Sequence, residues 1–222
     1  MPLDPVLAER LPLLAGVESY EQLDSDEDAR RRMTAFEDDG APWPVPEVPV
    51  RDVVMDAAGH RFRSRVYGRG TGAAPCLVWA HGGAFAAGGI EMNEADLVAR
   101  ELVRRTGGVL VSVDYTLVPQ ASYPALHRQV AAAWAWARQH AEELGVDESR
   151  IGLGGASAGG ALALAAAREM PADGAHSTLL PAYLVLAYPV THREWTPDPH
   201  VERLMAGMPQ ILRFPLEGVR SF

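Results

Sequence analysis

The chain has 222 residues, of which 48% are hydrophobic and 22% are charged, as in an ordinary globular protein. This length allows one large domain whose core buries about 70% of the unfolded surface. The formal net charge of −9 argues against nucleic acid or an anionic membrane as a partner. The N-terminal stretch MPLDPVLAER lacks the basic start and apolar core of a signal peptide, and no apolar stretch reaches the roughly 18 residues of a membrane span. We therefore expect a soluble cytoplasmic protein.

The first 68 residues predict a small helical appendage followed by a hairpin. Helical spacing in VLAERLPLLAGV and DEDARRRMTAF predicts two short helices within residues 1–40. The proline-rich stretch APWPVPEVPV predicts an extended connector, because proline blocks helix continuation. The segments VRDVVMDA and HRFRSRVYG predict two strands that turn at Ala58 and Gly59.

From residue 76 onward, short apolar runs alternate with helical patterns. The predicted strands are CLVWA (76–80), VLVSVDY (109–115), RIGLGG (150–155) and AYLVLAYPV (182–190). The predicted helices lie in MNEADLVARELVRRTG, YPALHRQVAAAWAWARQHAEELG and ALALAAAREM. This alternation predicts an α/β fold, with a mostly parallel sheet covered by helices on both faces and an antiparallel N-terminal edge.

The only cysteine, Cys76, cannot form an intrachain disulfide, so nothing indicates an oxidising compartment. It opens the apolar run CLVWA. We therefore expect a buried structural thiol rather than a reactive one.

The stretch GLGGASAGG places Ser157 between Gly155 and Gly159, in the pattern G-x-S-x-G. The pattern lies between a predicted strand and a predicted helix, which is typical of a nucleophile held on a tight, strained turn. The hydroxyl would then lie at the positive end of a helix dipole, where developing negative charge is favoured. Two alternatives stay open: a loop that only lets the helix pack on the strand, and a dinucleotide-binding loop, whose G-x-G-x-x-G pattern would need glycine at position 157.

The stretch WAHGGAFAAGG follows the CLVWA strand. A glycine-rich turn can direct backbone N–H groups at an oxygen anion. We expect the N–H groups of Gly83 and Ala84, with that of Ala158, to form a three-point oxyanion hole. We expect His81 to brace this loop by hydrogen bonding rather than to act as a base.

Asp114 and Tyr115 end the next strand, in SVDYTLVPQASYPA. Asp114 has the chemistry of a catalytic acid. It lies on a strand before the nucleophile's segment, however, so we expect a structural role.

Together, HGGAF, DYTLVPQASYPA and GGASAGG resemble the hormone-sensitive lipase family of α/β-hydrolases, which includes bacterial esterases. The resemblance covers roughly residues 45 to 190. It implies an α/β-hydrolase fold, Ser157 as nucleophile, and oxyanion donors at Gly83, Ala84 and Ala158. It also implies an N-terminal cap with its linker over residues 1–45 and a hydrolase core over 46–222.

Two residues depart from the family's pattern. Ala84 stands where the family has a third glycine, and a positive φ there would cost an alanine about 1 kcal/mol. Ala156 replaces the usual aspartate before the serine, which removes a local hydrogen-bonding side chain but no triad member.

The resemblance implies a triad in the order serine, acid, histidine, but neither the acid nor the histidine can be placed. After AYPV the chain offers a surface or cap-contacting segment, without a further buried strand. We therefore expect a truncated chain whose last strands are missing and whose sixth strand forms an exposed apolar edge, a site for self-association. His192, near Glu194 and Asp198, stays open as a replacement base. His176 and His200 are less suitable. We expect His60, His127 and His140 to lie on connectors or helix surfaces.

The sequence thus predicts a serine hydrolase of small-molecule carboxylic esters, impaired by the missing triad members, with no metal and no organic cofactor. Loss of triad members costs on the order of 10⁶ in turnover. The alternative is a non-catalytic, ligand-binding pseudo-hydrolase or a gene fragment.

Overall fold

The computed structural model describes residues 3–38, 44–170, 180–191 and 198–213. Contacts within the chain group it into two compact units, residues 1–43 with 192–222, and residues 44–191. The domain boundary after residue 45 stays a prediction. Among the helices of the described ranges, none is both long and apolar enough to span a bilayer.

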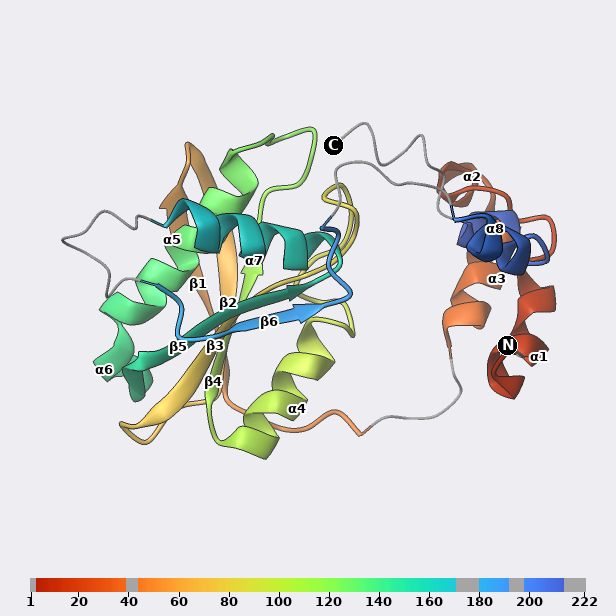
Figure 1. Ribbon diagram of the computed structural model, residues 1–222. Helices are drawn as coiled ribbons and strands as arrows, with labels where there is room; N and C mark the ends of the chain where they lie inside the picture. The colour runs from red at the N-terminus through yellow and green to blue at the C-terminus, as the bar shows by residue number, and fades with distance from the viewer. Residues whose placement is uncertain (1–2, 39–43, 171–179, 192–197, 214–222) are drawn as a thin grey trace. The chain divides into compact units, whose positions relative to one another are not determined.

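The larger unit is built on one sheet, in which the described residues form six strands in the order β1-β2-β4-β3-β5-β6 (Figure 1). The strands are β1 Val50–Ala57, β2 His60–Tyr67, β3 Ala74–Ala80, β4 Val109–Asp114, β5 Val146–Ala156 and β6 Leu184–Ala187. β1, β2 and β4 pair antiparallel, whereas β4, β3, β5 and β6 pair parallel. The predicted mostly parallel sheet with an antiparallel N-terminal edge is confirmed.

The predicted hairpin is also confirmed. Ala57 pairs with His60, and the two turn residues Ala58 and Gly59 have φ values of 53° and 79°. Two consecutive left-handed residues are the requirement of a type I′ turn, whose twist matches that of the strands it joins.

Helices cover both faces of the sheet. They are α4 Asp96–Thr106, α5 Ala125–Gln139, α6 Ala141–Leu144 and α7 Ala158–Glu169. α4 packs on one face, where Ala99 and Val103 join a buried cluster with Leu77 and Trp79. α5, α6 and α7 contribute to the larger cluster on the other face, around Val78. The continuous apolar strands are explained by this double coverage.

Two predicted elements of this unit are shorter than expected. The helix predicted over residues 123–145 divides at His140, which ends α5 with φ −105° and ψ 18° before α6 begins. The strand predicted over 182–190 is regular only at Leu184–Ala187, and it ends where Tyr188 turns the chain with φ 35°. Both differences arise from single-residue backbone geometry that an apolar pattern does not encode.

In the smaller unit, the described residues form more helical pieces than the two predicted before residue 40. They are α1 Pro5–Arg10, the 3₁₀ helix η1 Leu11–Leu14, α2 Tyr20–Ser25 and α3 Glu27–Glu37. Pro12 accounts for the first break, since a proline inside a helix lacks an N–H and clashes with the preceding turn. After the sheet come α8 Pro199–Met205 and η2 Gln210–Leu212. Ile211 packs against Leu14, Val17 and Met33, so of the two roles left open for this segment the structure shows contact with the N-terminal helices.

β6 lies at the edge of the sheet that the described residues form. Leu184 and Val185 are 42% and 40% exposed, and Tyr183 is also exposed. The predicted exposed apolar edge is therefore present, while self-association through it stays a proposal.

Candidate active site

Ser157 lies on a sharp turn between β5 and α7. Its φ of 51° and ψ of −118° are strained for a residue with a side chain, and such strain gathers at functional sites. Its N–H donates to the carbonyl of Ala187 at 2.9 Å, and its carbonyl accepts from the N–H of Val190 at 3.3 Å. The backbone of the turn is therefore held by the end of β6 and by the residues that follow it. Ser157 is half-buried and is the N-cap residue of α7.

The two glycines of the G-x-S-x-G pattern allow a close approach of backbone to backbone. A Cβ atom on Gly159 would overlap the carbonyl oxygen of Ala80, and one on Gly155 would overlap the backbone of Gly159. Packing of helix on strand therefore explains the glycines, as the first alternative supposed. It does not explain the strained geometry of Ser157.

The loop after β3 lies beside this turn. β3 and β5 are parallel neighbours with Ala80 opposite Gly155, so their carboxyl ends meet at one edge of the sheet. A Cβ atom on Gly82 would lie 3.4 Å from the Cβ of Ser157. The two motifs that the sequence analysis singled out are thus in contact.

The loop continues through three left-handed residues in succession. Gly83, Ala84 and Phe85 have φ values of 114°, 52° and 63°. Glycine adopts such angles freely, whereas a positive φ costs an alanine about 1 kcal/mol. Ala84, in place of the family's third glycine, therefore has the backbone strain expected for it.

Side chains fix the peptide groups at the start of this loop. The Tyr115 hydroxyl donates to the His81 carbonyl at 3.0 Å, and the Tyr115 ring stacks on the His81 imidazole with centroids 4.4 Å apart. His81 Nδ1 lies 2.6 Å from the Gly82 carbonyl, so this nitrogen must carry the proton and donate it. In a trans peptide the N–H points away from the carbonyl, so this bond also sets the direction of the Gly83 N–H. The expected bracing role of His81 is confirmed.

Burial lowers the pKa of His81, because the fully buried imidazole is charged only at a desolvation cost. The ring is therefore neutral near pH 7 and suited to the single donated hydrogen bond. Cys76 is likewise buried, and burial raises the pKa of its thiol to about 12, which confirms a structural thiol.

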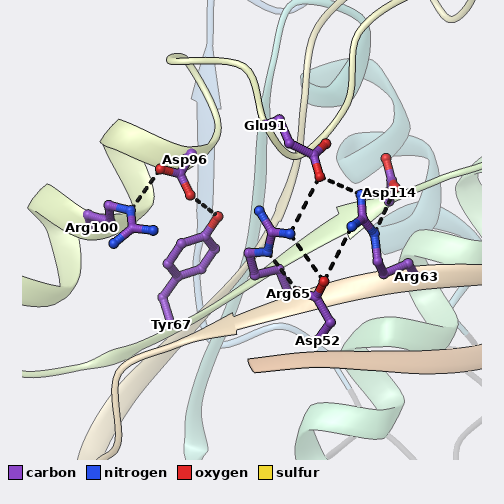
Figure 2. A network of polar contacts seen from close by, with 8 residues as sticks. All are labelled: Asp52, Arg63, Arg65, Tyr67, Glu91, Asp96, Arg100 and Asp114. Atoms are coloured by element: carbon purple, nitrogen blue, oxygen red, sulfur yellow. Dashed lines mark hydrogen bonds and ion pairs between the residues drawn. The ribbon is translucent and has the colours of Figure 1, made fainter. Parts of the chain in front are cut away.

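Asp114 belongs to a charged network at the sheet, shown in Figure 2. Arg63 reaches Asp114 at 3.1 Å and Glu91 at 2.5 Å, and also contacts Asp52. Arg65 donates to Asp52 at 2.7 Å, and this hydrogen bond lowers the pKa of the Asp52 carboxyl. The network connects β1, β2 and β4 with the far end of the loop that begins at His81. The expected structural role of Asp114 is confirmed.

A second group in Figure 2 joins α4 to the sheet. The Tyr67 hydroxyl donates to Asp96 at 2.7 Å, and Asp96 pairs with Arg100 at 2.7 Å. Burial raises the pKa of Tyr67, so the phenol stays protonated and serves as the donor.

In the part of the chain that the structure describes, no imidazole hydrogen-bonds to Ser157. His192, its neighbour Glu194 and His176 fall outside the described residues. The expected surface position of His127 is wrong: it is buried, with Nε2 2.9 Å from Glu169 between α5 and α7. His60 begins β2, and His200 lies on α8.

The site contains one acidic residue that the sequence analysis did not single out, Glu94. The N–H of Gly82 donates to its Oε2 at 3.1 Å. The two residues are 12 positions apart in a loop without periodicity, so no sequence pattern signals the contact. Across the described residues, no group of three or more His, Cys, Asp or Glu is placed to hold a metal ion.

Residues 77–212, more than half of the chain, match the family described as the alpha/beta hydrolase fold. The chain belongs to this family, whose members are hormone-sensitive lipase-like hydrolases. The order of motifs and the sheet topology agree with the match.

Similar proteins of this family are named as esterases. An acetyl esterase of Salmonella paratyphi B is 33% identical over 123 residues, which are 55% of this chain and 38% of that protein. Esterase LipI of Mycobacterium tuberculosis is 32% identical over 128 residues, 56% of this chain and 39% of that protein. The chain therefore matches less than half the length of these curated relatives.

Solved structures with a similar fold are also described as esterases. The hyperthermophilic esterase of the archaeon Pyrobaculum calidifontis has a TM-score of 0.78 and 28% identity, covering 100% of this chain and 70% of that one. A thermophilic carboxylesterase cloned from a metagenomic library has a TM-score of 0.64 and 32% identity, covering 86% of this chain and 63% of that one.

Proposed function

We propose that this chain carries the nucleophile and the oxyanion donors of a serine esterase that acts on small carboxylic esters. The observation that carries the proposal is the strained Ser157 turn in contact with the loop at Gly82 and Gly83. Family membership and the names of the similar proteins, acetyl esterase and esterase, support the choice of an ester substrate.

In the proposed reaction, the Ser157 hydroxyl oxygen attacks the acyl carbon and the carbonyl oxygen becomes an anion. The N–H groups of Gly83, Ala84 and Ala158 donate to this anion. Ala158 is the first residue of α7, where the N–H has no acceptor within the helix and carries part of the positive helix dipole. One preorganised donor of this kind contributes about 10²–10³ in turnover.

The acyl-enzyme then forms as the alcohol leaves with a proton, and water releases the acid. The proton on the Ser157 hydroxyl needs a base, since a serine is a poor nucleophile at neutral pH without one. His192 stays a candidate for that base. Without a base, the oxyanion donors and substrate binding leave a residual rate of about 10³–10⁴ over water.

The experiment uses an activated ester, p-nitrophenyl acetate, because its good leaving group makes acylation detectable even when turnover is slow. The protein and Ser157→Ala are incubated with the ester, and modified peptides are identified by mass spectrometry. Ser122→Ala, which changes an exposed serine, is the matched control. We expect one acetyl group on the peptide of Ser157 in the protein and in the control. Equal acetylation of Ser157→Ala, on other residues, would contradict the proposal.

A second candidate is a non-catalytic binding module. It is favoured by one observation, that no imidazole among the described residues hydrogen-bonds to Ser157. Such a module would bind a non-hydrolysable ester analogue saturably, yet would not be acetylated at Ser157.

We also propose that the exposed edge at β6 allows self-association, supported by the exposure of Leu184 and Val185. Light scattering of the purified protein tests this. A stable monomer at all concentrations would count against it.

A further inference from the structure

We propose that Glu94 is a positioning residue, which holds the loop of Gly82 and Gly83 in the orientation that the oxyanion donors need. The proposal rests on the proposed function, because it assigns a task within the same site. It concerns a carboxylate that would act through the backbone of Gly82 and not on the substrate.

The argument begins with the peptide that joins His81 to Gly82. Its N–H donates to Oε2 of Glu94 at 3.1 Å, and its carbonyl accepts from the Tyr115 hydroxyl at 3.0 Å. The peptide is therefore held from both sides. The next peptide is held at its carbonyl by His81 Nδ1, and its own N–H is the one that Gly83 offers to the oxyanion. Glu94 thus supplies the first of three bonds that orient the donors in series.

Glu94 differs from the nearby acidic residues Glu91 and Asp96 in the partners of its carboxylate. Glu91 pairs with Arg63, and Asp96 pairs with Arg100. Glu94 makes no ion pair with a described residue, and its Oε1 is buried without a hydrogen-bond partner among them. Keeping a carboxylate in such a place is costly, because burial of an acceptor without a donor is not compensated. A side chain that served packing alone would not require it.

Gly82 is also the point where the carboxylate comes near the nucleophile. A Cβ atom on Gly82 would lie 3.8 Å from Glu94 Oε2 and 3.4 Å from the Cβ of Ser157. A change in the Gly82 backbone would therefore shift the donors relative to Ser157. A misplacement of about 1 Å in such a site can lower the rate by about 10²-fold.

The test compares Glu94→Ala with Glu94→Gln, whose amide oxygen can still accept the Gly82 N–H. Glu101→Ala is the control on the neighbouring helix α4, because this carboxylate contacts Arg104 and Arg105 at the surface. Two quantities are measured: the hydrogen exchange rate of the Gly82 amide by NMR, and the rate of Ser157 labelling by a fluorophosphonate.

We expect Gly82 exchange to be about tenfold faster or more in Glu94→Ala, since a hydrogen bond to a charged group is lost. Labelling of Ser157 should fall by about tenfold in that variant. Glu94→Gln and Glu101→Ala should stay within about threefold of the parent protein in both measurements. Rescue by glutamine distinguishes an acceptor for Gly82 from a side chain that only fills space.

Unchanged Gly82 exchange in Glu94→Ala would overturn the proposal, as would a Glu94→Gln variant that is as impaired as Glu94→Ala. If Glu94→Ala does not fold, Glu94→Asp replaces it, because it keeps the charge and withdraws the oxygens by one methylene. Faster Gly82 exchange in Glu94→Asp supports the proposal, and unchanged exchange overturns it. If the parent protein is not labelled at all, the proposed function fails, whereas Gly82 exchange still decides the role of Glu94.

Discussion

The two turns of the candidate site are adjacent in space but are held in different ways. The turn at Ser157 is fixed by backbone, through hydrogen bonds with Ala187 and Val190 and through glycines that admit close packing. The loop at Gly82 is held by side chains as well as by backbone, through the hydrogen bonds of His81, Tyr115 and Glu94. The difference predicts that the first turn is sensitive mainly to added atoms, whereas the second should also respond to side-chain substitutions and to pH.

The largest effect is expected for Gly159→Ala. The new Cβ would overlap the carbonyl oxygens of Ala80 and His81, which are backbone atoms and cannot move aside independently. We expect the free energy of unfolding to fall by roughly 3 kcal/mol or more, measured by urea denaturation. Gly207→Ala is the matched control, since its Cβ would meet no atom within 4 Å. Equal stability of the two variants would show that the turn is not as tightly packed as described.

The sequence predicted this turn well because its requirements are local. Glycines at 155 and 159, with a strand before and a helix after, constrain the backbone within five residues. The contact between Gly82 and Glu94 could not be predicted, because it depends on how a loop without periodicity folds back on itself. The same contrast holds for the two helix breaks. Proline signals the break at Pro12, whereas nothing in the apolar pattern signals the break at His140.

The contribution of the loop at Gly82 to stability should decrease in acid, through His81. Burial gives His81 a lower pKa in the folded protein than the value of about 6.5 in the unfolded chain. The unfolded chain therefore takes up the proton first, so the stability from neutral His81 is complete above pH 6.5 and is lost as the pH falls toward the lowered pKa. The slope is at most about 1.4 kcal/mol per pH unit for one proton. Unfolding free energies between pH 7 and 5, compared with His81→Gln, measure it; identical slopes would contradict the assignment.

A smaller effect is expected for Tyr115→Phe, which keeps the ring on His81 but removes the donor to the His81 carbonyl. We expect a loss of about 1 kcal/mol in unfolding free energy. Tyr123→Phe, at a side chain that is 78% exposed, should change stability far less. Thermal denaturation of both variants checks the difference, and a reversed order would argue against the bracing bond.

The smallest effect is expected for Arg63→Gln, in the network that contacts the far end of the same loop (Figure 2). These ion pairs are partly exposed, so we expect about 0.5–1 kcal/mol, decreasing at high salt. Urea denaturation at low and high ionic strength measures this. A salt-independent loss above that range would indicate a buried network instead.

The central proposal is that Ser157, on its strained turn, is the nucleophile and that the N–H groups of Gly83, Ala84 and Ala158 donate to the anion formed in the reaction. Fluorophosphonate labelling tests it most directly, since the reagent mimics the tetrahedral intermediate and reacts with an activated serine. We predict labelling of the folded protein at Ser157, lost in Ser157→Ala. A folded protein that remains unlabelled, or equal labelling of Ser157→Ala, would contradict the account.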